Sequence, residues 1–117
     1  MLRAKIILEE LNEENSSFFA VYIETKNANQ LFLSESEDKL GTLAVAVPQP
    51  NLVGSTISSV LIGDKNVMIA RLLAELLAHK TNKISLVSVY TKSVTEQRAH
   101  IFRKLMDRTL KKREETK

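Results

Sequence analysis

Few side chains in this chain of 117 residues could do chemistry. The best candidate for an anion site is Gly63-Asp64-Lys65-Asn66, which follows an apolar run and precedes a long helical pattern, so that backbone amides could face an anion there. The segment lacks the repeated glycines and the lysine–serine pair of a phosphate-binding loop. Its composition favours helix capping instead, with Asp64 as the N-cap of the following helix.

The remaining titratable residues give no catalytic or metal-binding pattern. His79 lies at the end of one predicted helix and His100 on another, and a lone histidine is usually a surface or cap residue. The glutamate pairs at 9–10 and 13–14 lack the spacing of a calcium loop. The chain has no cysteine, which excludes thiolate, disulfide and cysteine-zinc chemistry. We therefore predict no catalytic residue, metal or cofactor, and a protein that is not an enzyme.

Charge is distributed unevenly along the chain. Residues 1–40 carry four basic and eight acidic side chains, whereas residues 93–117 carry eight basic and four acidic ones. Such asymmetry can orient a protein partner, or it can mark a nucleic-acid surface. The alternative function is therefore nucleic-acid binding through phosphate contacts of the basic last helix, although the aromatic content of 5% provides no evident stacking platform. The residues concerned are Arg103, Lys104, Arg108, Lys111, Lys112 and Arg113.

Period-two and period-3.6 patterns predict eight elements that would position these residues. Strands are expected at 2–11, 18–25, 30–36, 43–47, 55–62 and 84–90. The helix expected at 66–80 is apolar around well over half of its circumference and should be buried, with one polar stripe. Ser93 and Glu96 form a capping box, which predicts a second helix starting at Val94. The members of the apolar set on the first helix are Val67, Met68, Ile69, Leu72, Leu73, Leu76 and Leu77.

The order of these elements predicts an α+β fold, with a mostly antiparallel sheet of about six strands (β-β-β-β-β-α-β-α) and two helices packed on one face. Five short-linked strands favour an antiparallel meander, while the pairing of strand 84–90 stays open. Residues 1–110 are expected to form a single domain, and the basic tail 111–117 is expected to fray. A sheet with helices on one face leaves its other face and its edges open, which predicts a twofold homodimer.

Both prolines of the chain lie at the start of a loop that could contact a partner. Its apolar side chains have little secondary structure to bury them, which indicates a partner-binding role; the alternative is that they tuck under the sheet edge. No apolar run approaches the roughly 18 residues of a membrane span and no secretory signal is evident, so we expect a soluble, cytoplasmic protein. The tentative partner-binding residues are Pro48, Pro50, Leu52, Val53 and Gly54.

Several short motifs occur in a characteristic order from residue 39 onward. They are 39–43 (KLGTL) with Pro48, 60–64 (VLIGD), the helix core 72–77, the strand 86–89 (LVSV), and Lys92-Ser93 with Glu96. In these motifs the chain resembles the proteasome assembly chaperone 3 family, as an archaeal-type homologue. The resemblance covers about two thirds of the chain. It implies a small non-enzymatic chaperone that binds proteasome α-subunits and helps them form their ring, as a homodimer or together with a related assembly chaperone.

Overall fold

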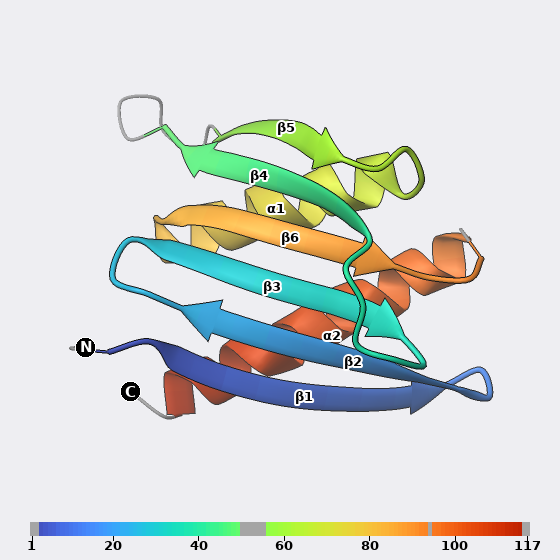
Figure 1. Cartoon of the computed structure of the whole chain (residues 1–117). Helices are drawn as coiled ribbons and strands as arrows, with labels where there is room; N and C mark the ends of the chain where they lie inside the picture. Colours follow the sequence, from blue (N-terminus) through green and yellow to red (C-terminus); the bar gives the residue numbers. More distant parts are fainter. Residues whose placement is uncertain (1–2, 50–55, 94, 116–117) are drawn as a thin grey trace.

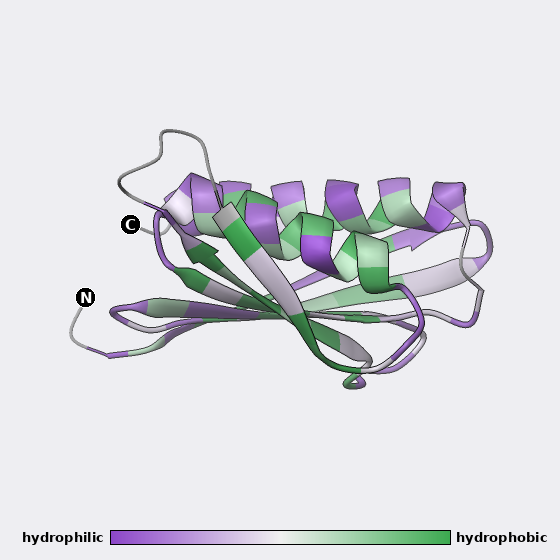
Figure 2. Cartoon of the chain, turned by 90° about the horizontal axis from the view of Figure 1, so that it is seen from above, coloured by the Kyte–Doolittle hydropathy of each residue, from purple (hydrophilic) through white to green (hydrophobic). Residues whose placement is uncertain are grey.

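The computed structural model describes residues 3–49, 56–93 and 95–115. Six strands form one sheet with the order β1-β2-β3-β6-β4-β5, and both helices lie on the same face of it (Figures 1 and 2). The predicted α+β fold with a mostly antiparallel sheet is therefore confirmed. The elements are β1 (Lys5–Glu13), β2 (Ser16–Glu24), β3 (Ala28–Glu35), β4 (Thr42–Pro48), β5 (Thr56–Ile62), α1 (Val67–Thr81), β6 (Ile84–Tyr90) and α2 (Glu96–Glu115).

The strand order differs from the expected meander at one place. β6 lies between β3 and β4, parallel to β3 and antiparallel to β4. β6 and the continuously apolar β4 are thereby neighbours in the interior of the sheet, where each is paired with a strand on both of its edges. Short connections alone do not reveal this insertion, because the last strand along the chain can enter between strands that are adjacent in sequence.

The core fills the space between the sheet and the two helices. α2 lies over β1 and β2, and its Phe102 meets Phe18 edge to face with the ring centroids 5.6 Å apart. α1 lies over β4, β5 and β6 and turns the small side chains of Ala70, Ala74 and Ala78 toward the core. Small residues on this side of α1 let its backbone come close to the sheet.

α1 is less buried than the sequence predicts. Met68 is 85% exposed and Leu72 is 54% exposed, although both belong to the apolar set that was expected to be covered. α1 buries its side toward the sheet, through residues such as Leu73 and Leu77, while its outward side faces solvent. A helix that covers one layer of sheet and has no layer above it can bury only that side.

The helix starts also differ from the expected caps. The residue before α1 is Asn66, in the left-handed conformation with φ 58°, and no side chain caps it; the prediction that Asp64 is the N-cap was wrong. α2 begins at Glu96, where the amide of Arg98 donates to Thr95 Oγ1 at 3.1 Å. Thr95 therefore replaces Ser93 as the cap, and the predicted starting residue Val94 lies outside the described residues.

α2 continues as a helix through Glu115, into the segment from residue 111 that was expected to fray. Arg113 explains this continuation, since its guanidinium donates two hydrogen bonds of 2.9 Å to the carboxylate of Glu24 on β2. Within the described residues, no helix is long and apolar enough to cross a membrane.

Candidate functional site

The face of the sheet opposite the helices carries no helix (Figure 2). In a strand, successive side chains point to opposite faces, and residues paired across strands share a face. The residues of one face pack into the core beneath the helices. We call the apolar residues of the other face the open face: Ile6, Leu8, Phe19, Val21, Ile23, Phe32, Leu43, Val45, Val47, Ile57, Ile84 and Leu86.

The pairing register aligns these residues in rows across the sheet. One row runs from Leu8 through Val21 and Phe32 to Ser88 and Leu43. The next row contains Ile6, Ile23, Gln30, Leu86, Val45 and Ser59, and so crosses all six strands. Neither row contains a charged side chain, so an apolar partner could lie across the whole width of the sheet.

Several side chains of the open face are strongly exposed in the single chain. Ile6, Leu8 and Ile57 expose 65%, 62% and 59% of their surface. Six strands spaced about 4.8 Å apart, with about seven residues of 3.3 Å each, give a face of roughly 24 by 23 Å, or about 550 Å². Stable interfaces bury about 800 Å² of accessible surface per partner, and the largest apolar patch on a typical monomer covers about 300–600 Å². The open face therefore lies within the range of the largest monomer patches, which often mark protein contacts, and below the area that each partner buries in a standard interface.

The β3–β4 connection, which crosses β6, attaches at one end of this face. The Gly41 amide donates to Ser88 Oγ at 2.8 Å, and a Cβ at Gly41 would lie 2.1 Å from the Val89 carbonyl oxygen. Lys39 Nζ lies 4.9 Å from the centroid of the Tyr90 ring. Only glycine allows the backbone to lie this close to β6, so Gly41 fixes the connection against the strand.

The acidic side chains of the N-terminal part and the basic side chains of the C-terminal part largely pair with one another within the molecule, on the side of the helices. β1 supplies acidic side chains and α2 supplies basic ones: Lys104 lies 2.8 Å from Glu13, and Arg108 lies 3.4 Å from Glu9. Lys112 Nζ also donates to the Leu8 carbonyl at 3.3 Å. Because much of the basic helix is directed at its own sheet, the nucleic-acid alternative is not favoured.

Glu24, beneath the C-terminal part of α2, is a buried carboxylate. Burial raises the pKa of Glu24, but hydrogen bonds from Arg113 and Lys83, together with their charges, outweigh this effect and lower the pKa to about 2. Burial raises the pKa of the neighbouring Tyr22 hydroxyl, which donates to Asn29 at 2.6 Å. These contacts tie α2 to β2 and to the start of β6.

Glu35, at the other end of α2, is buried at the end of β3. Its burial is outweighed by hydrogen bonds from the Lys92 amide, Thr91 and Ser16 and by the charge of Arg98, so that its pKa is lowered. Arg98 Nη2 lies 3.4 Å from this carboxylate, and the guanidinium lies 5.1 Å from the centroid of the Phe18 ring. Both carboxylates thus hold the helix layer on the sheet.

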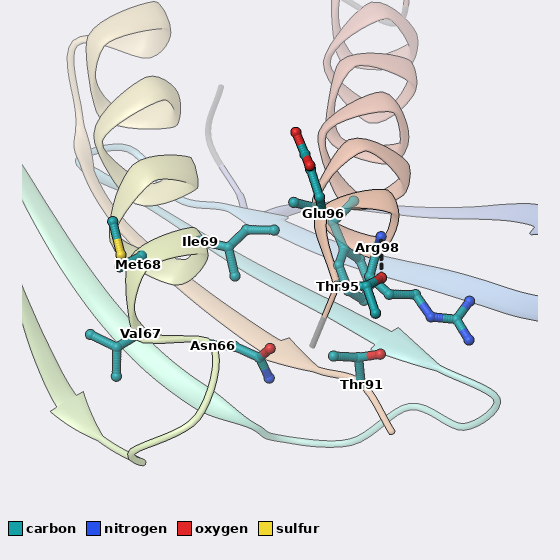
Figure 3. Close-up of a pocket in the computed structure, with 10 residues that line it drawn as sticks. Asn66, Val67, Met68, Ile69, Thr91, Thr95, Glu96 and Arg98 are labelled. Atoms are coloured by element: carbon teal, nitrogen blue, oxygen red, sulfur yellow. Dashed lines mark hydrogen bonds between the residues drawn. The ribbon is translucent and has the colours of Figure 1, made fainter. Parts of the chain in front are cut away.

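A hollow of about 430 Å³ lies between the starts of the two helices (Figure 3). Its walls are mainly apolar and include Val67, Ile69 and Phe102, while Arg98 at its margin is already held by Glu14 and Glu35. Across the described part of the chain, no three His, Asp or Glu side chains are grouped so that they could hold a metal ion.

The residues predicted to bind a partner are only partly described. Pro48 ends β4, where it is paired with Thr56 of β5. Pro50, Leu52, Val53 and Gly54 lie outside the described residues. The sequence-based site did not include the open face, although a signal for it was present: residues 18–23 are apolar at both alternating positions, which indicates a strand with two apolar faces.

Comparison with known proteins shows a similarity at the level of structure. No protein-family model matches the sequence, and no curated protein is similar to it. Among solved structures, the chain is similar to one from a chaperone complex for yeast 20S proteasome assembly, with a TM-score of 0.71 over 92% of this chain and 94% of that chain. The two sequences are 16% identical, so the similarity shows the fold alone. The chain therefore has a proteasome assembly chaperone-like fold.

Proposed function

We propose that this chain is a non-enzymatic proteasome assembly chaperone that binds proteasome α-subunits through protein–protein contacts and helps them form their ring. The observation that carries the proposal is the fold shared with a structure from a yeast proteasome assembly chaperone complex, which here leaves a broad face of the sheet for contact between protein chains. A chaperone of this kind needs apolar surface for another protein and needs no reactive group. We expect it to act in the cytoplasm.

We further propose that the chain is an archaeal-type member of the proteasome assembly chaperone 3 family. The motifs that carry this resemblance include Gly41 and Gly63, and both have a steric function in the fold. Gly63 has φ 98°, a conformation that side chains rarely adopt, and a Cβ there would lie 2.5 Å from Thr42 Oγ1. The matching residues thus meet demands of this backbone, which supports a relationship beyond chance similarity.

The open face is proposed to be the contact of a twofold homodimer, with a related assembly chaperone as the alternative occupant. An apolar face of about 550 Å² would be costly to leave in water, so a permanent partner is favoured over an occasional one. A second copy presents the same uncharged rows, and a face that meets itself about a twofold axis satisfies the self-complementarity that such an interface requires.

The α-subunit contact is tested by retention of purified proteasome α-subunits on the immobilised chain over a range of salt concentrations. Circular dichroism of the same preparation establishes that the chain is folded. Retention of at least one α-subunit is expected; no retention at any salt concentration, with folded protein, would rule out the chaperone function.

The dimer is tested by light scattering at micromolar concentration. The unmodified chain should have about twice its mass of 13.2 kDa, and the double variant Ile6→Lys/Leu8→Lys should be monomeric because charges would be buried in the interface. Met68→Lys is the control, since Met68, which is 85% exposed, is an even more exposed apolar residue on the helix side. If the unmodified chain is a monomer, the homodimer proposal is wrong, and pairing with a related chaperone remains as the alternative.

The loop after β4 is proposed as an additional partner contact through Pro48, Pro50, Leu52, Val53 and Gly54. Replacement of Leu52 and Val53 by serine should leave the melting temperature nearly unchanged and weaken the retention of α-subunits. A large loss of stability would instead mean that these side chains are part of the core.

A further inference from the structure

β5 forms one edge of the sheet and is unusually bare for an edge strand. Within the described residues it pairs with β4 on one side, and its other side is the end of the sheet. Its residues, Thr56–Ile62 (TISSVLI), include no charged residue and no proline. Edge strands carry a row of unpaired amide and carbonyl groups, which proteins commonly protect with charges, prolines, bulges or a covering segment.

The opposite edge, β1, shows such protection. It carries Lys5, Glu9, Glu10 and Glu13, and α2 reaches over it: Lys112 donates to the Leu8 carbonyl, and Arg108 pairs with Glu9. A partner strand at β1 would have to displace these contacts. The difference between the two edges therefore singles out β5 as the edge that is left able to pair.

The regular part of β5 is its first half. Its register with β4 runs without interruption from Thr56 to Val60 and then shifts, because Leu61 of β5 is an extra residue opposite the step from Ala44 to Leu43. A bulge twists an edge and hinders pairing, so a strand that adds to β5 would align with residues 57–60.

We infer that β5 binds an extended strand of a client protein, which adds to the sheet as a seventh strand. Unpaired backbone groups in strand geometry are satisfied best by another strand. The inference rests on the proposed function, because it assigns the open face to the second copy and β5 to the client. If a second copy also bound at β5, each chain would contact other copies through two different surfaces, the open face and β5. Two such contacts produce open-ended filaments unless their symmetry axes combine into a closed point group.

The side chains around β5 define the chemistry of that client strand. On the helix side, Ser58 hydrogen-bonds to Glu75 and accepts from Arg71 Nε at 3.1 Å, which holds one acidic and one basic side chain at the edge. On the other side Ile57 is 59% exposed and continues the open face. The client strand should therefore alternate, with polar or charged residues toward α1 and apolar residues toward the open face.

Two neighbouring proline variants, Ser59→Pro and Val60→Pro, test the backbone contact. In an antiparallel ladder, consecutive amides alternate between pointing at the partner strand and pointing away from it. One of the two prolines removes a bond to β4 and should destabilise the fold, whereas the other removes only an outward donor. The variant that keeps the melting temperature has lost only an outward amide of β5, and we call it the edge-block variant. It should weaken binding of a client about tenfold.

The measurement is hydrogen exchange of the β5 amides in the unmodified chain, alone and with two probes. The probes are a purified proteasome α-subunit and a synthetic peptide of alternating valine and charged residues. Slower exchange at residues 57–60 with either probe supports the inference, and weaker binding to the edge-block variant strengthens it. Hydrogen exchange uses the unmodified chain, so it tests whether a strand binds at β5 even if both proline variants unfold.

Three results would overturn the inference. The first is binding of the α-subunit without any protection of the β5 amides, which leaves the proposed function intact. The second is protection of these amides in the free chain that rises with its concentration, which would assign the edge to a second copy. The third is failure of both probes to protect β5. If the α-subunit does not bind at all and the peptide still protects β5, the edge inference stands and the α-subunit proposal fails.

Discussion

The replacement of Glu24 by glutamine tests whether one buried ion cluster holds α2 on the sheet. Glu24 is 2% exposed and accepts hydrogen bonds from Lys83 at 2.6 Å and from Arg113 at 2.9 Å. Glutamine keeps the shape of the side chain and removes its charge. The two basic side chains would then keep their partly buried positions with a weaker partner, although Arg113 retains its contact of 2.8 Å with Glu114.

The magnitude follows from the pKa of Glu24. It falls from an ordinary value of 4.5 to about 2 in the folded chain. Each pKa unit corresponds to about 1.4 kcal/mol, so the charged form contributes about 3 kcal/mol to the free energy of unfolding at neutral pH. Removal of one partner from a buried ion pair typically costs about 3–5 kcal/mol, which agrees with this value. We expect Glu24→Gln to lose about 3 kcal/mol at pH 7.

The sign of the pH dependence follows from the same shift. Because the folded chain binds the Glu24 proton less readily than the unfolded chain, this stabilisation is fully present above pH 4.5 and is lost as the pH falls toward about 2. Urea denaturation followed by circular dichroism, at one protein concentration and at several pH values, measures it. The variant should show a shallower decrease of stability in this range, with a remainder from Glu35, whose pKa is also lowered.

Glu115→Gln is the matched control, because it removes an exposed carboxylate from the end of the same helix. It should leave stability nearly unchanged. The reasoning would be refuted if Glu24→Gln cost less than about 1 kcal/mol at pH 7, or if its pH profile ran parallel to that of the unmodified chain. Either result would mean that the cluster is solvated and that packing alone holds α2.

Two further predictions concern the backbone. Thr95→Ala should cost about 1 kcal/mol because it removes the cap of α2, whereas Ser93→Ala should be nearly neutral; equal losses in urea denaturation would contradict this assignment. Gly41→Ala should cost about 3 kcal/mol or more, because the added Cβ would lie 2.1 Å from the Val89 carbonyl oxygen. Leu40→Ala, at the exposed neighbouring position, should have little effect. Equal melting temperatures of the two variants would contradict the close approach of Gly41 to β6.

The secondary structure could be predicted from the sequence because its signals are local. Alternating residues and turn residues identified all six strands, and the turn at Glu14 and Asn15, where both φ values are positive, joins β1 to β2 with two residues. Strand order is a different kind of property. The position of β6 between β3 and β4 depends on pairing between segments more than 40 residues apart, for which spacing along the chain provides no signal.

The caps were predicted less well, for a specific physical reason. Ser93 with Glu96 fits the capping pattern by spacing, but Thr95, two residues later, offers the same hydroxyl chemistry and is the residue that accepts the amide of Arg98. Similarly, the apolar set of the 66–80 helix indicated burial on most sides. Which side is covered depends on the number of layers, and Met68 is exposed because none of the described segments forms a layer above α1.

The pairing of acidic β1 with basic α2 changes the meaning of the charge asymmetry. In the sequence the asymmetry suggested an external partner, but Glu9 and Glu13 face Arg108 and Lys104 of the same chain. The charges lie on the helix side, and the central rows of the open face contain none. Binding through that face should therefore depend on buried apolar area and change little with salt, because screening acts on exposed charges. A homodimer that dissociated in moderate salt would place the dimer contact on the helix side instead.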